Sequence, residues 1–318
     1  MSRPILLLTL ITMLAACNDA TTAPESSTRD VDAAPELPGG GAFQITLRYV
    51  GSPSPRQQLA VERAVAQWQR VIASDLTSVP VKAEAGACFR NQPAIDETID
   101  DILIFIDFTY VDGPGNILGE AGPCFIRSES GLPVIGFLRL DNADLREMEA
   151  IGTMDDVVLH EIGHVLGIGT LWSRHRLLSG TGGPDPRYTG AAAVSAYRAV
   201  GGLAGTVPVE NTGDSSTREG HWRESVFGNE LMTGWIGSGA NPRSAVTIAS
   251  LEDLGYNADA EVADAYALGS QVDALAQRSG SHTDLRGRER VLRPKFHIDR
   301  RGRRHQPAAP HMTARSRA

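Results

Sequence analysis

The stretch 157–167 reads VVLHEIGHVLG and places two histidines four positions apart. On a helix, His160 and His164 lie on one face, so both imidazoles can bind a single metal ion. Glu161 follows the first histidine, and its carboxylate can lie beside a water molecule on that ion. This H-E-x-x-H spacing is typical of hydrolytic zinc centres, in which the glutamate is the general base.

The residues around this pentapeptide predict a buried helix with defined ends. Its apolar side chains are Val157, Val158, Ile162, Val165 and Leu166. Thr153 and Asp156 form a capping pair at the start, and Gly167 lets the chain leave the helix at its end. Two histidines on a core-facing helix can also be hydrogen-bonded structural residues, so the pentapeptide alone leaves that interpretation open.

Composition and charge limit the class of protein. The 318 residues are 42% hydrophobic and 6% aromatic, as in a globular protein with one large domain or two small ones. Residues 18–277 hold 17 Lys and Arg against 35 Asp and Glu, a net charge of −18, which argues against nucleic-acid binding. Residues 278–318 hold 12 against three, a net charge of +9, with few apolar residues, and predict a disordered basic tail.

The first 17 residues differ in kind from the rest. The apolar run 5–14 follows a short basic start, is too short to span a membrane, and predicts a signal peptide. It ends in LAAC, which resembles the bacterial lipobox and predicts cleavage before Cys17 and acylation of its thiol. A plain signal peptide with an incidental cysteine is the alternative. We expect an extracytoplasmic, membrane-anchored lipoprotein, with residues 18–41 as a flexible tether.

Two further cysteines, Cys88 and Cys124, complete the count of three. In an exported protein, two remaining thiols most simply pair, so the sequence predicts a Cys88–Cys124 disulfide. A thiol that binds the metal and keeps the protein latent is the alternative that we favour less.

Hydrophobic periodicity predicts an α+β architecture around the metal-binding stretch. Strands are expected at 43–49, 79–81, 102–108 and 133–141, and helices at 55–76, 191–200 and 245–255. The glycine-rich residues 168–220 are interpreted as an elaborated loop that borders the site. The segment 141–144, DNAD, offers oxygen ligands for calcium, but we favour a turn that caps the next helix.

A catalytic zinc site needs three protein ligands and an open position for water. His221 is the best third ligand, because it lies in the segment HWRES shortly before residues 229–234, NELMTG. His175 lies among arginines and is expected to be exposed. A carboxylate ligand remains the alternative, with three candidates: Glu210, Glu224 and Glu230.

These motifs together resemble the leishmanolysin family of metzincins over about residues 95–260. In that family the pattern H-E-x-x-H-x-x-G is followed by a long insertion, a His-Trp segment that supplies the third ligand, and a Glu-Leu-Met turn. Here His221 follows His164 by 57 residues, and residues 230–232 read ELM. The sequence shows neither a Cys-containing latency pro-segment nor the family's cysteine-rich later region, so it looks like a minimal, prokaryotic-type member.

The resemblance implies a metzincin-like fold over residues 42–277. Residues 42–167 would hold a twisted mixed sheet and the zinc helix, and residues 168–277 an irregular and helical subdomain with the Met-turn. The cleft between them would take an extended peptide or protein substrate. That substrate would pair with a strand at the sheet edge, either 133–141 or its neighbour.

The resemblance also implies one catalytic zinc, bound by His160, His164 and His221. Glu161 would take a proton from the attacking water and pass it to the leaving amine. Met232 would form an apolar floor beneath the metal. The implied activity is that of a zinc-dependent endopeptidase anchored outside the cytoplasm.

Several assignments stay open at this stage. Glu230 could orient a ligand or be a surface carboxylate, and Tyr256 could donate to an oxyanion or simply pack at a helix end. Two other functions compete with peptide hydrolysis: hydrolysis of a non-protein substrate, and a non-catalytic adhesin or binding module on the same scaffold. Glu161 argues against the binding module, because a scaffold needs no base beside the metal.

Overall fold

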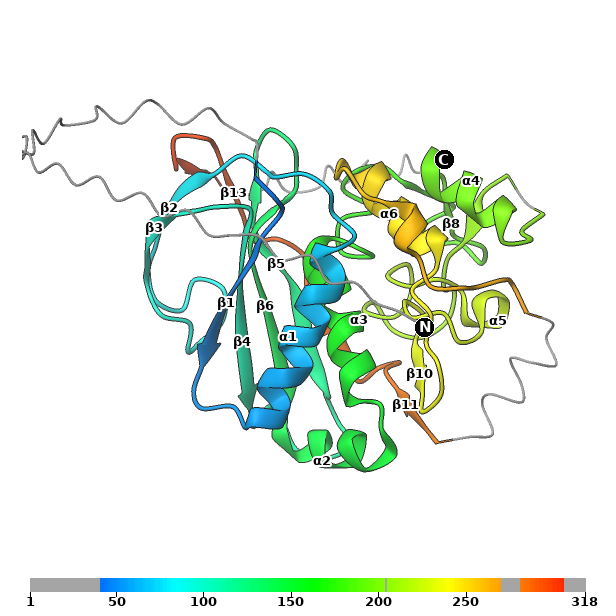
Figure 1. The fold of residues 1–318 in the computed structure, drawn as a ribbon, viewed down its shortest axis with the longest axis horizontal. Helices are drawn as coiled ribbons and strands as arrows, with labels where there is room; N and C mark the ends of the chain where they lie inside the picture. The colour runs from blue at the N-terminus through cyan, green and yellow to red at the C-terminus, as the bar shows by residue number, and fades with distance from the viewer. Residues whose placement is uncertain (1–40, 204, 270–280, 306–318) are drawn as a thin grey trace, which may run out of the picture. The chain divides into compact units, whose positions relative to one another are not determined.

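A mixed β-sheet is the centre of the computed structural model, which describes residues 41–203, 205–269 and 281–305 (Figure 1). Its strand order is β1–β4–β6–β5–β13–β14, and β12 also pairs with β5. Strands β1, β4 and β6 run parallel, and β5 is antiparallel to β6. The strands are β1 (Ile45–Val50), β4 (Ile102–Thr109), β5 (Gly119–Arg127), β6 (Pro133–Asp141), β12 (Glu289–Val291), β13 (Phe296–Ile298) and β14 (Arg304–His305).

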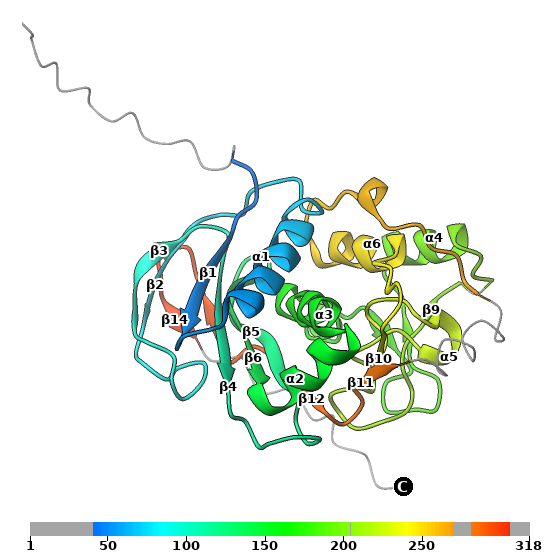
Figure 2. The ribbon, with the colours of Figure 1, turned by 60° about the horizontal axis from the view of Figure 1, so that its bottom comes forward.

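Two helices, α1 (Pro55–Gln69) and α3 (Met154–Leu166), lie side by side against this sheet (Figures 1 and 2). Ser54 and Gln57 close the capping box at the start of α1. The buried indole of Trp68 donates to the carbonyl of Leu159 at 2.9 Å and fixes α1 against α3. The position of the metal-binding helix is therefore set by the core of the sheet.

Helix α1 ends at Gln69, earlier than the predicted end near Leu76. Ile72 is buried as the helical pattern requires, but it forms a β-bridge with Ala258. The amide of Ala73 likewise donates to the carbonyl of Asn257 at 2.7 Å. The apolar spacing therefore continued past the helix because the next residues are buried in an extended conformation.

The helix α3 begins without the predicted capping pair. Thr153 is its N-cap residue, but no capping bond from its side chain is found among the described residues. Its hydroxyl instead pairs with the hydroxyl of Thr283 at 2.6 Å. Gly167 ends the helix with a left-handed φ of 117°, which confirms the predicted end.

The helix before α3, α2 (Asn142–Ile151), explains the DNAD segment. The Asp141 carboxylate accepts from the amide of Ala143 and so caps α2. Its other oxygen accepts from three backbone amides, those of Val111, Asp112 and Gly113, each at 2.9 Å. This carboxylate is thus saturated by donors, which favours the capping interpretation over a calcium site.

The opposite face of the sheet carries a second apolar cluster. A hairpin of β2 (Val79–Ala83) and β3 (Ile95–Ile99) packs there with Phe89, Phe105 and Phe137. The structure joins Cys88 to Cys124 of β5, with their Cα atoms 5.6 Å apart. The predicted disulfide therefore ties the loop after β2 to the strand beside the metal-binding helix.

Replacing both cysteines, Cys88→Ser and Cys124→Ser, is expected to lower the free energy of unfolding by about 4 kcal/mol. The disulfide closes a loop with a sequence separation of 36, and its loss restores that loop's entropy to the unfolded chain. Urea unfolding of the oxidised wild type and the double variant measures the difference. Dithiothreitol should bring the wild type to the variant's midpoint and leave the variant unchanged; equal midpoints before reduction would contradict the estimate.

The described chain after α3, residues 167–203 and 205–269, is irregular and partly helical. Its helices α4 (Ala191–Ala199) and α6 (Ala245–Leu254) pack on each other, at the right in Figure 2. Its core stacks aromatic rings, with Trp222 against Trp172 and Phe227. The remaining short elements are β7 (Leu178–Ser179), β8 (Arg187–Tyr188), β9 (Val207–Pro208), α5 (Glu224–Phe227), β10 (Trp235–Gly237) and the 3₁₀ turn η1 (Ala260–Val262).

The predicted disordered tail at 278–318 is wrong for residues 281–305. They form β11 (His282–Asp284), which pairs with β10, and then the strands β12, β13 and β14. The segment has few apolar residues, but Leu285 and Ile298 are completely buried. Its basic residues also find acidic partners on the body, so the charge that suggested disorder helps to dock the segment. The folded domain thus extends beyond the predicted end at residue 277.

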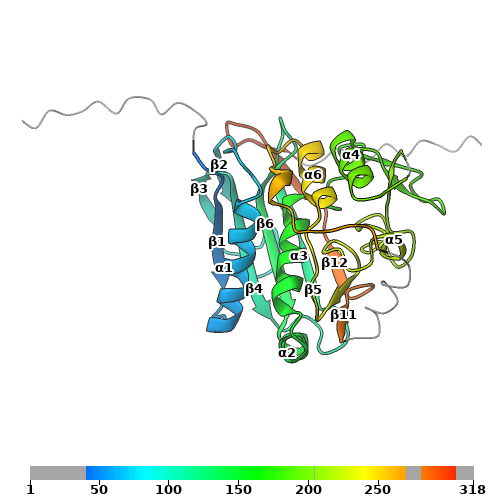
Figure 3. The ribbon, with the colours of Figure 1, turned by 45° about the vertical axis from the view of Figure 1, so that its right-hand side comes forward.

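Of the two strands expected at the sheet edge beside the site, 133–141 or its neighbour, 133–141 is an interior strand. β6 lies between β4 and β5, and the outer edge of β5 pairs with β12 and β13 (Figures 1 and 3). The sequence of β5, GEAGPCFIR, contains two glycines and a proline and lacks the alternation of a typical strand.

None of the helices in the described ranges is long and apolar enough to cross a membrane. The predicted signal peptide, Cys17 and nearly all of the tether lie outside the described residues.

Candidate metal centre

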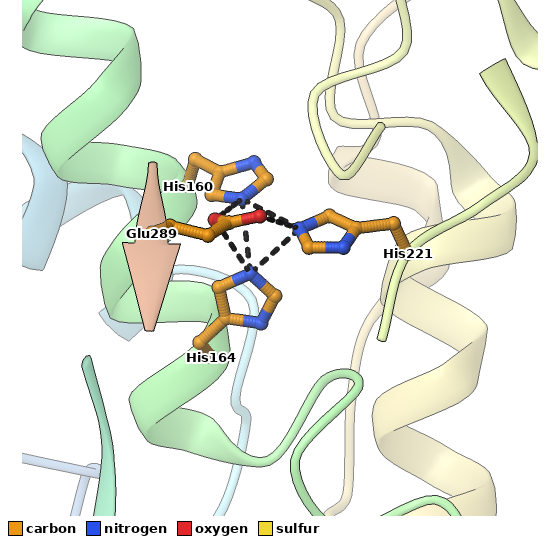
Figure 4. A group of neighbouring side chains, drawn as sticks. All are labelled: His160, His164, His221 and Glu289. Carbon is orange, nitrogen blue, oxygen red and sulfur yellow. Dashed lines mark hydrogen bonds and ion pairs between the residues drawn. The ribbon is translucent and has the colours of Figure 1, made fainter. Parts of the chain in front are cut away.

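Three histidines meet at the side of α3 that faces the C-terminal part of the chain (Figure 4). His160 and His164 lie one turn apart on α3, and His221 comes from the loop before α5. Their Nε2 atoms are 2.9, 3.0 and 3.2 Å from one another, and all three rings are completely buried. The structure thus brings together the three residues that the sequence proposed as ligands.

Each ring is oriented by a hydrogen bond from its other nitrogen. The Nδ1 atoms of His160, His164 and His221 lie 2.6, 2.8 and 3.0 Å from the carbonyl oxygens of Leu231, Ile168 and Thr217. A carbonyl only accepts, so each Nδ1 carries the proton and each Nε2 presents a lone pair. Three converging lone pairs repel one another unless a cation lies between them.

A fourth group, which the sequence analysis missed, completes the cluster. Glu289 at the start of β12 directs its carboxylate toward the three rings (Figure 4). Its oxygens lie 3.0 Å from Nε2 of His221, 3.4 Å from Nε2 of His160 and 3.7 Å from Nε2 of His164. Glu289 is 1% exposed, so this carboxylate is withdrawn from solvent.

The donor set fits a four-coordinate zinc ion. Bonds of about 2.0–2.1 Å in a tetrahedron place neighbouring ligand atoms about 3.3 Å apart, close to the separations found here. Neither oxygen of Glu289 has a conventional hydrogen-bond donor among the described residues. Imidazole nitrogen and carboxylate oxygen are both common zinc ligands, and a divalent cation would satisfy these buried groups.

Burial and the mutual contacts shift the ionisation of these groups. Burial lowers the pKa of His164 to about 4, which keeps its imidazole neutral near pH 7 and able to bind a metal. Burial, followed by the neighbouring Glu289 carboxylate, raises the pKa of Glu161.

Glu161 lies on α3 beside this cluster. Its side chain is completely buried, and neither carboxylate oxygen has a hydrogen-bond donor among the residues described. The Oε1 atom lies 3.4 Å from the position that a Cβ on Gly119 would take, and Gly119 pairs in register with Glu289. An unsatisfied carboxylate at this depth is costly, as expected of a group kept for chemistry rather than for stability.

Met232 packs beneath the helix that carries the ligands. It is completely buried, and its Sδ atom would lie 2.9 Å from a Cβ added to Gly163. Gly163 stands between the two helical ligands, so the thioether lies against the backbone of the metal-binding turn. The structure therefore places Met232 beside the turn of α3 that carries His160 and His164.

Gly163→Ala is expected to destabilise the protein by about 1–3 kcal/mol, because the added methyl has no room. It would lie 2.9 Å from Sδ of Met232 and 3.1 Å from Cζ2 of Trp68, whose ring is hydrogen-bonded in place. Urea unfolding measures the change. Gly239→Ala is the matched control, since an added methyl there meets nothing within 4 Å in the described structure; an equal effect in both variants would refute the steric explanation.

Among the described residues, the histidine cluster includes none of the three alternative carboxylate ligands, Glu210, Glu224 and Glu230. Glu210 accepts from the amides of Asn211, Thr212 and Glu224. Glu230 accepts from the amides of Met232 and Ser244, and from two hydroxyls, those of Ser244 and Thr247. Glu230 is completely buried, so the surface interpretation is wrong; it shapes the turn that carries Met232. The carboxylate that does reach the histidines is Glu289.

Tyr256 packs at a helix end. Its ring is 4% exposed and its hydroxyl donates to the carbonyl of Leu166, the last residue of α3, at 3.0 Å. The structure therefore supports a packing role for Tyr256. Trp222 has a comparable role for the third ligand, because its buried indole donates to Thr247 at 2.8 Å and fixes the residue next to His221.

Residues 97–274 match a protein-family model, that of the leishmanolysin peptidases. No curated protein matches the chain. The matched range contains the three histidines, Glu161 and Met232, and it ends before Glu289. The carboxylate at the cluster is thus contributed by a part of the chain that the family model does not cover.

Proposed function

Because the chain belongs to the leishmanolysin family of metallopeptidases, we propose that it is a zinc-dependent endopeptidase. The observation that carries the proposal is the convergence of three Nε2 lone pairs beside the unsatisfied carboxylate of Glu161. His160, His164 and His221 would hold the ion. The family assignment supports a metallopeptidase, and this geometry supports the specific residues.

In the proposed mechanism, the residues of the chain position the ion and move the proton. When bound, zinc supplies Lewis-acid polarisation of the scissile carbonyl and of the attacking water. Glu161 accepts a proton from that water and then delivers it to the leaving amine. The carbonyls of Leu231, Ile168 and Thr217 keep each imidazole in the tautomer that leaves Nε2 free.

We propose that an extended peptide binds along the outer edge of β5, beside α3. The edge residues Gly119–Ala121 already pair with a strand, β12, and thereby bring Glu289 to the metal centre. A substrate strand in the same place would carry its scissile bond past the same point. Main-chain hydrogen bonds to the sheet edge would then supply affinity that depends little on side-chain identity.

We propose further that the protein acts outside the cytoplasm as a lipoprotein anchored through Cys17. The lipobox-like segment before this residue motivates the proposal. The Cys88–Cys124 disulfide supports export, because disulfides persist in oxidising compartments. Metabolic labelling with a radioactive fatty acid is expected to label the wild type and not Cys17→Ser; equal labelling of both would refute the anchor.

The proposed activity is tested with unfolded casein as substrate. Two zinc-loaded proteins are compared, the wild type and Glu289→Ala, which lacks the carboxylate at the cluster. The Glu289→Ala variant is expected to hydrolyse casein, whether or not the wild type does. It should lose this activity with 1,10-phenanthroline and regain it with zinc. Because loss of Glu289 leaves the pairing of β12 with β5, a third protein also carries Arg288→Ala and Arg290→Ala. If this folded, zinc-loaded triple variant cleaves no casein, endopeptidase function is contradicted and a non-protein substrate is favoured.

A second candidate function has one observation in its favour. If Glu289 joined His160, His164 and His221 at a tetrahedral ion, no position would stay open, as in structural zinc sites. Such a site would suit a non-catalytic binding module. Under that hypothesis, removal of zinc would unfold the protein, and the Glu289→Ala variant would hydrolyse no casein.

A further inference from the structure

We propose that residues 281–305 are a built-in inhibitory segment and that Glu289 is the fourth ligand of the metal ion. The inference rests on the proposed function, since it assigns a form of regulation to that same site. In the structure described here, the segment holds the site in a closed state. Hydrolysis would require Glu289 to leave.

The position of Glu289 within its segment supports this role. It is the only acidic residue between 285 and 298, a stretch that holds Arg286, Arg288, Arg290, Arg293 and Lys295. Five cations surround the single carboxylate in sequence, yet that carboxylate is the group that reaches the three imidazoles. If the segment bound the acidic body only through its positive charge, it would have no need to bury a carboxylate.

Backbone hydrogen bonds fix the segment on both sides of the cluster. On the sheet side, the carbonyl of Arg288 accepts from the amide of Leu118 at 2.6 Å, and the amide of Leu292 donates to Ala121 at 2.8 Å. On the opposite side, the amide of Leu285 donates to Gly234 at 3.0 Å. Figure 3 shows β12 next to β5, and Figure 2 shows β11 beside its partner β10. The segment therefore crosses the metal centre and is held to the elements on either side of it.

Two ion pairs and one close backbone contact also hold the segment in place. Arg288 pairs with the buried Asp144 at 2.8 Å, and Arg290 pairs with Glu120 at 2.9 Å. Gly122 of β5 has a left-handed φ of 155°, and a Cβ there would lie 2.2 Å from the carbonyl oxygen of Leu292. The close approach of the segment thus depends on a glycine in the strand that receives it.

The docked segment excludes both water and substrate from the centre. The three histidines and Glu161 are 0% exposed, so a peptide cannot reach the base. The strand position on β5 that we assign to substrate is taken by β12. One segment thus fills the two sites that hydrolysis needs, the fourth position at the metal and the edge of the sheet.

Ligand access to the metal tests the inference without relying on activity. The full chain is loaded with Co²⁺, and acetohydroxamate is titrated while the visible spectrum is recorded. A centre open in a tenth of the molecules or fewer weakens apparent binding about tenfold or more. Glu289→Ala is therefore expected to bind acetohydroxamate at least about tenfold more tightly than the wild type. It should also show a changed Co²⁺ spectrum before the ligand is added.

Asp284→Asn is the matched control, because it removes one negative charge from the same segment at a half-exposed side chain that pairs with Arg286. It should bind acetohydroxamate as the wild type does.

Glu289→Gln replaces the alanine variant if that variant fails to fold, since the amide keeps the shape of the side chain and is a far weaker ligand. The double variant Arg288→Ala, Arg290→Ala is expected to raise affinity for acetohydroxamate as well, by weakening the docking alone. Identical spectra and affinities in the wild type and the folded Glu289 variants would overturn the inference.

The outcomes separate this inference from the proposed function. Tighter acetohydroxamate binding by Glu289→Ala, without casein cleavage by that variant or by the triple variant that also carries Arg288→Ala and Arg290→Ala, would uphold the fourth ligand and contradict the peptidase. Equal cleavage by the wild type and Glu289→Ala, with equal ligand access, would uphold the peptidase and overturn the inhibitory segment.

Discussion

Adding Glu161→Gln to the Glu289→Ala protein is expected to lower kcat for casein hydrolysis by about 10²–10⁴-fold, the range for loss of a general base. The amide cannot accept the proton of the attacking water, although it keeps the size of the buried side chain. Zinc content should not change, because the ion is held by the histidines rather than by Glu161. Hydrolysis rates and metal analysis on the same preparations measure both effects.

Glu149→Gln in the same background is the matched control, because Glu149 is exposed on α2. It should leave both hydrolysis and zinc content unchanged. A double variant that loses Glu161 and still cleaves casein at the rate of Glu289→Ala would exclude this residue as the base. Loss of zinc together with activity would show instead that Glu161 maintains the metal site.

His221→Ala is expected to weaken zinc binding by more than about 100-fold, beyond the range typical of changes in groups that only orient a ligand. The variant removes one of three converging Nε2 atoms and also the hydrogen bond between His221 and Thr217. His160, His164 and Glu289 would remain, so residual zinc is expected at high concentration. Competition with a fluorescent chelator measures the affinity.

The control for this prediction is His175→Ala, which makes the same change at a half-buried histidine outside the cluster. It should bind zinc as the wild type does. Unchanged affinity in His221→Ala would mean that another residue supplies the third ligand. The three carboxylates that the sequence left open, Glu210, Glu224 and Glu230, would then be the candidates to examine.

The sequence predicted the metal-binding helix well because its signals are local. Helical periodicity gives the apolar positions of α3, and Gly167 marks its end. Both lie in the structure where the pattern places them. The proposal of His221 drew on a segment 57 residues away, and depended on the His-Trp and Glu-Leu-Met motifs. Its convergence with α3 could not be read from periodicity, since it is set by the packing of Trp222.

Other parts of the site could not be predicted because they depend on long-range pairing. Strand β5 contains glycines and a proline that suit its neighbours, and Gly122 is needed only because Leu292 comes so close. Glu289 lies in a basic stretch whose composition is typical of disorder. One signal was available, namely the single acidic residue between 285 and 298. Its role becomes clear only when β12 is paired with β5.

Zinc-edge X-ray absorption on the zinc-loaded wild-type chain tests the central claim most directly. We predict one zinc with four nitrogen or oxygen neighbours at about 2.0–2.1 Å, with the outer-shell scattering of three imidazoles. Such a spectrum would establish that His160, His164 and His221 share one ion. A spectrum with fewer than three imidazoles, or a chain that retains no zinc, would contradict the metal centre on which the proposed function depends.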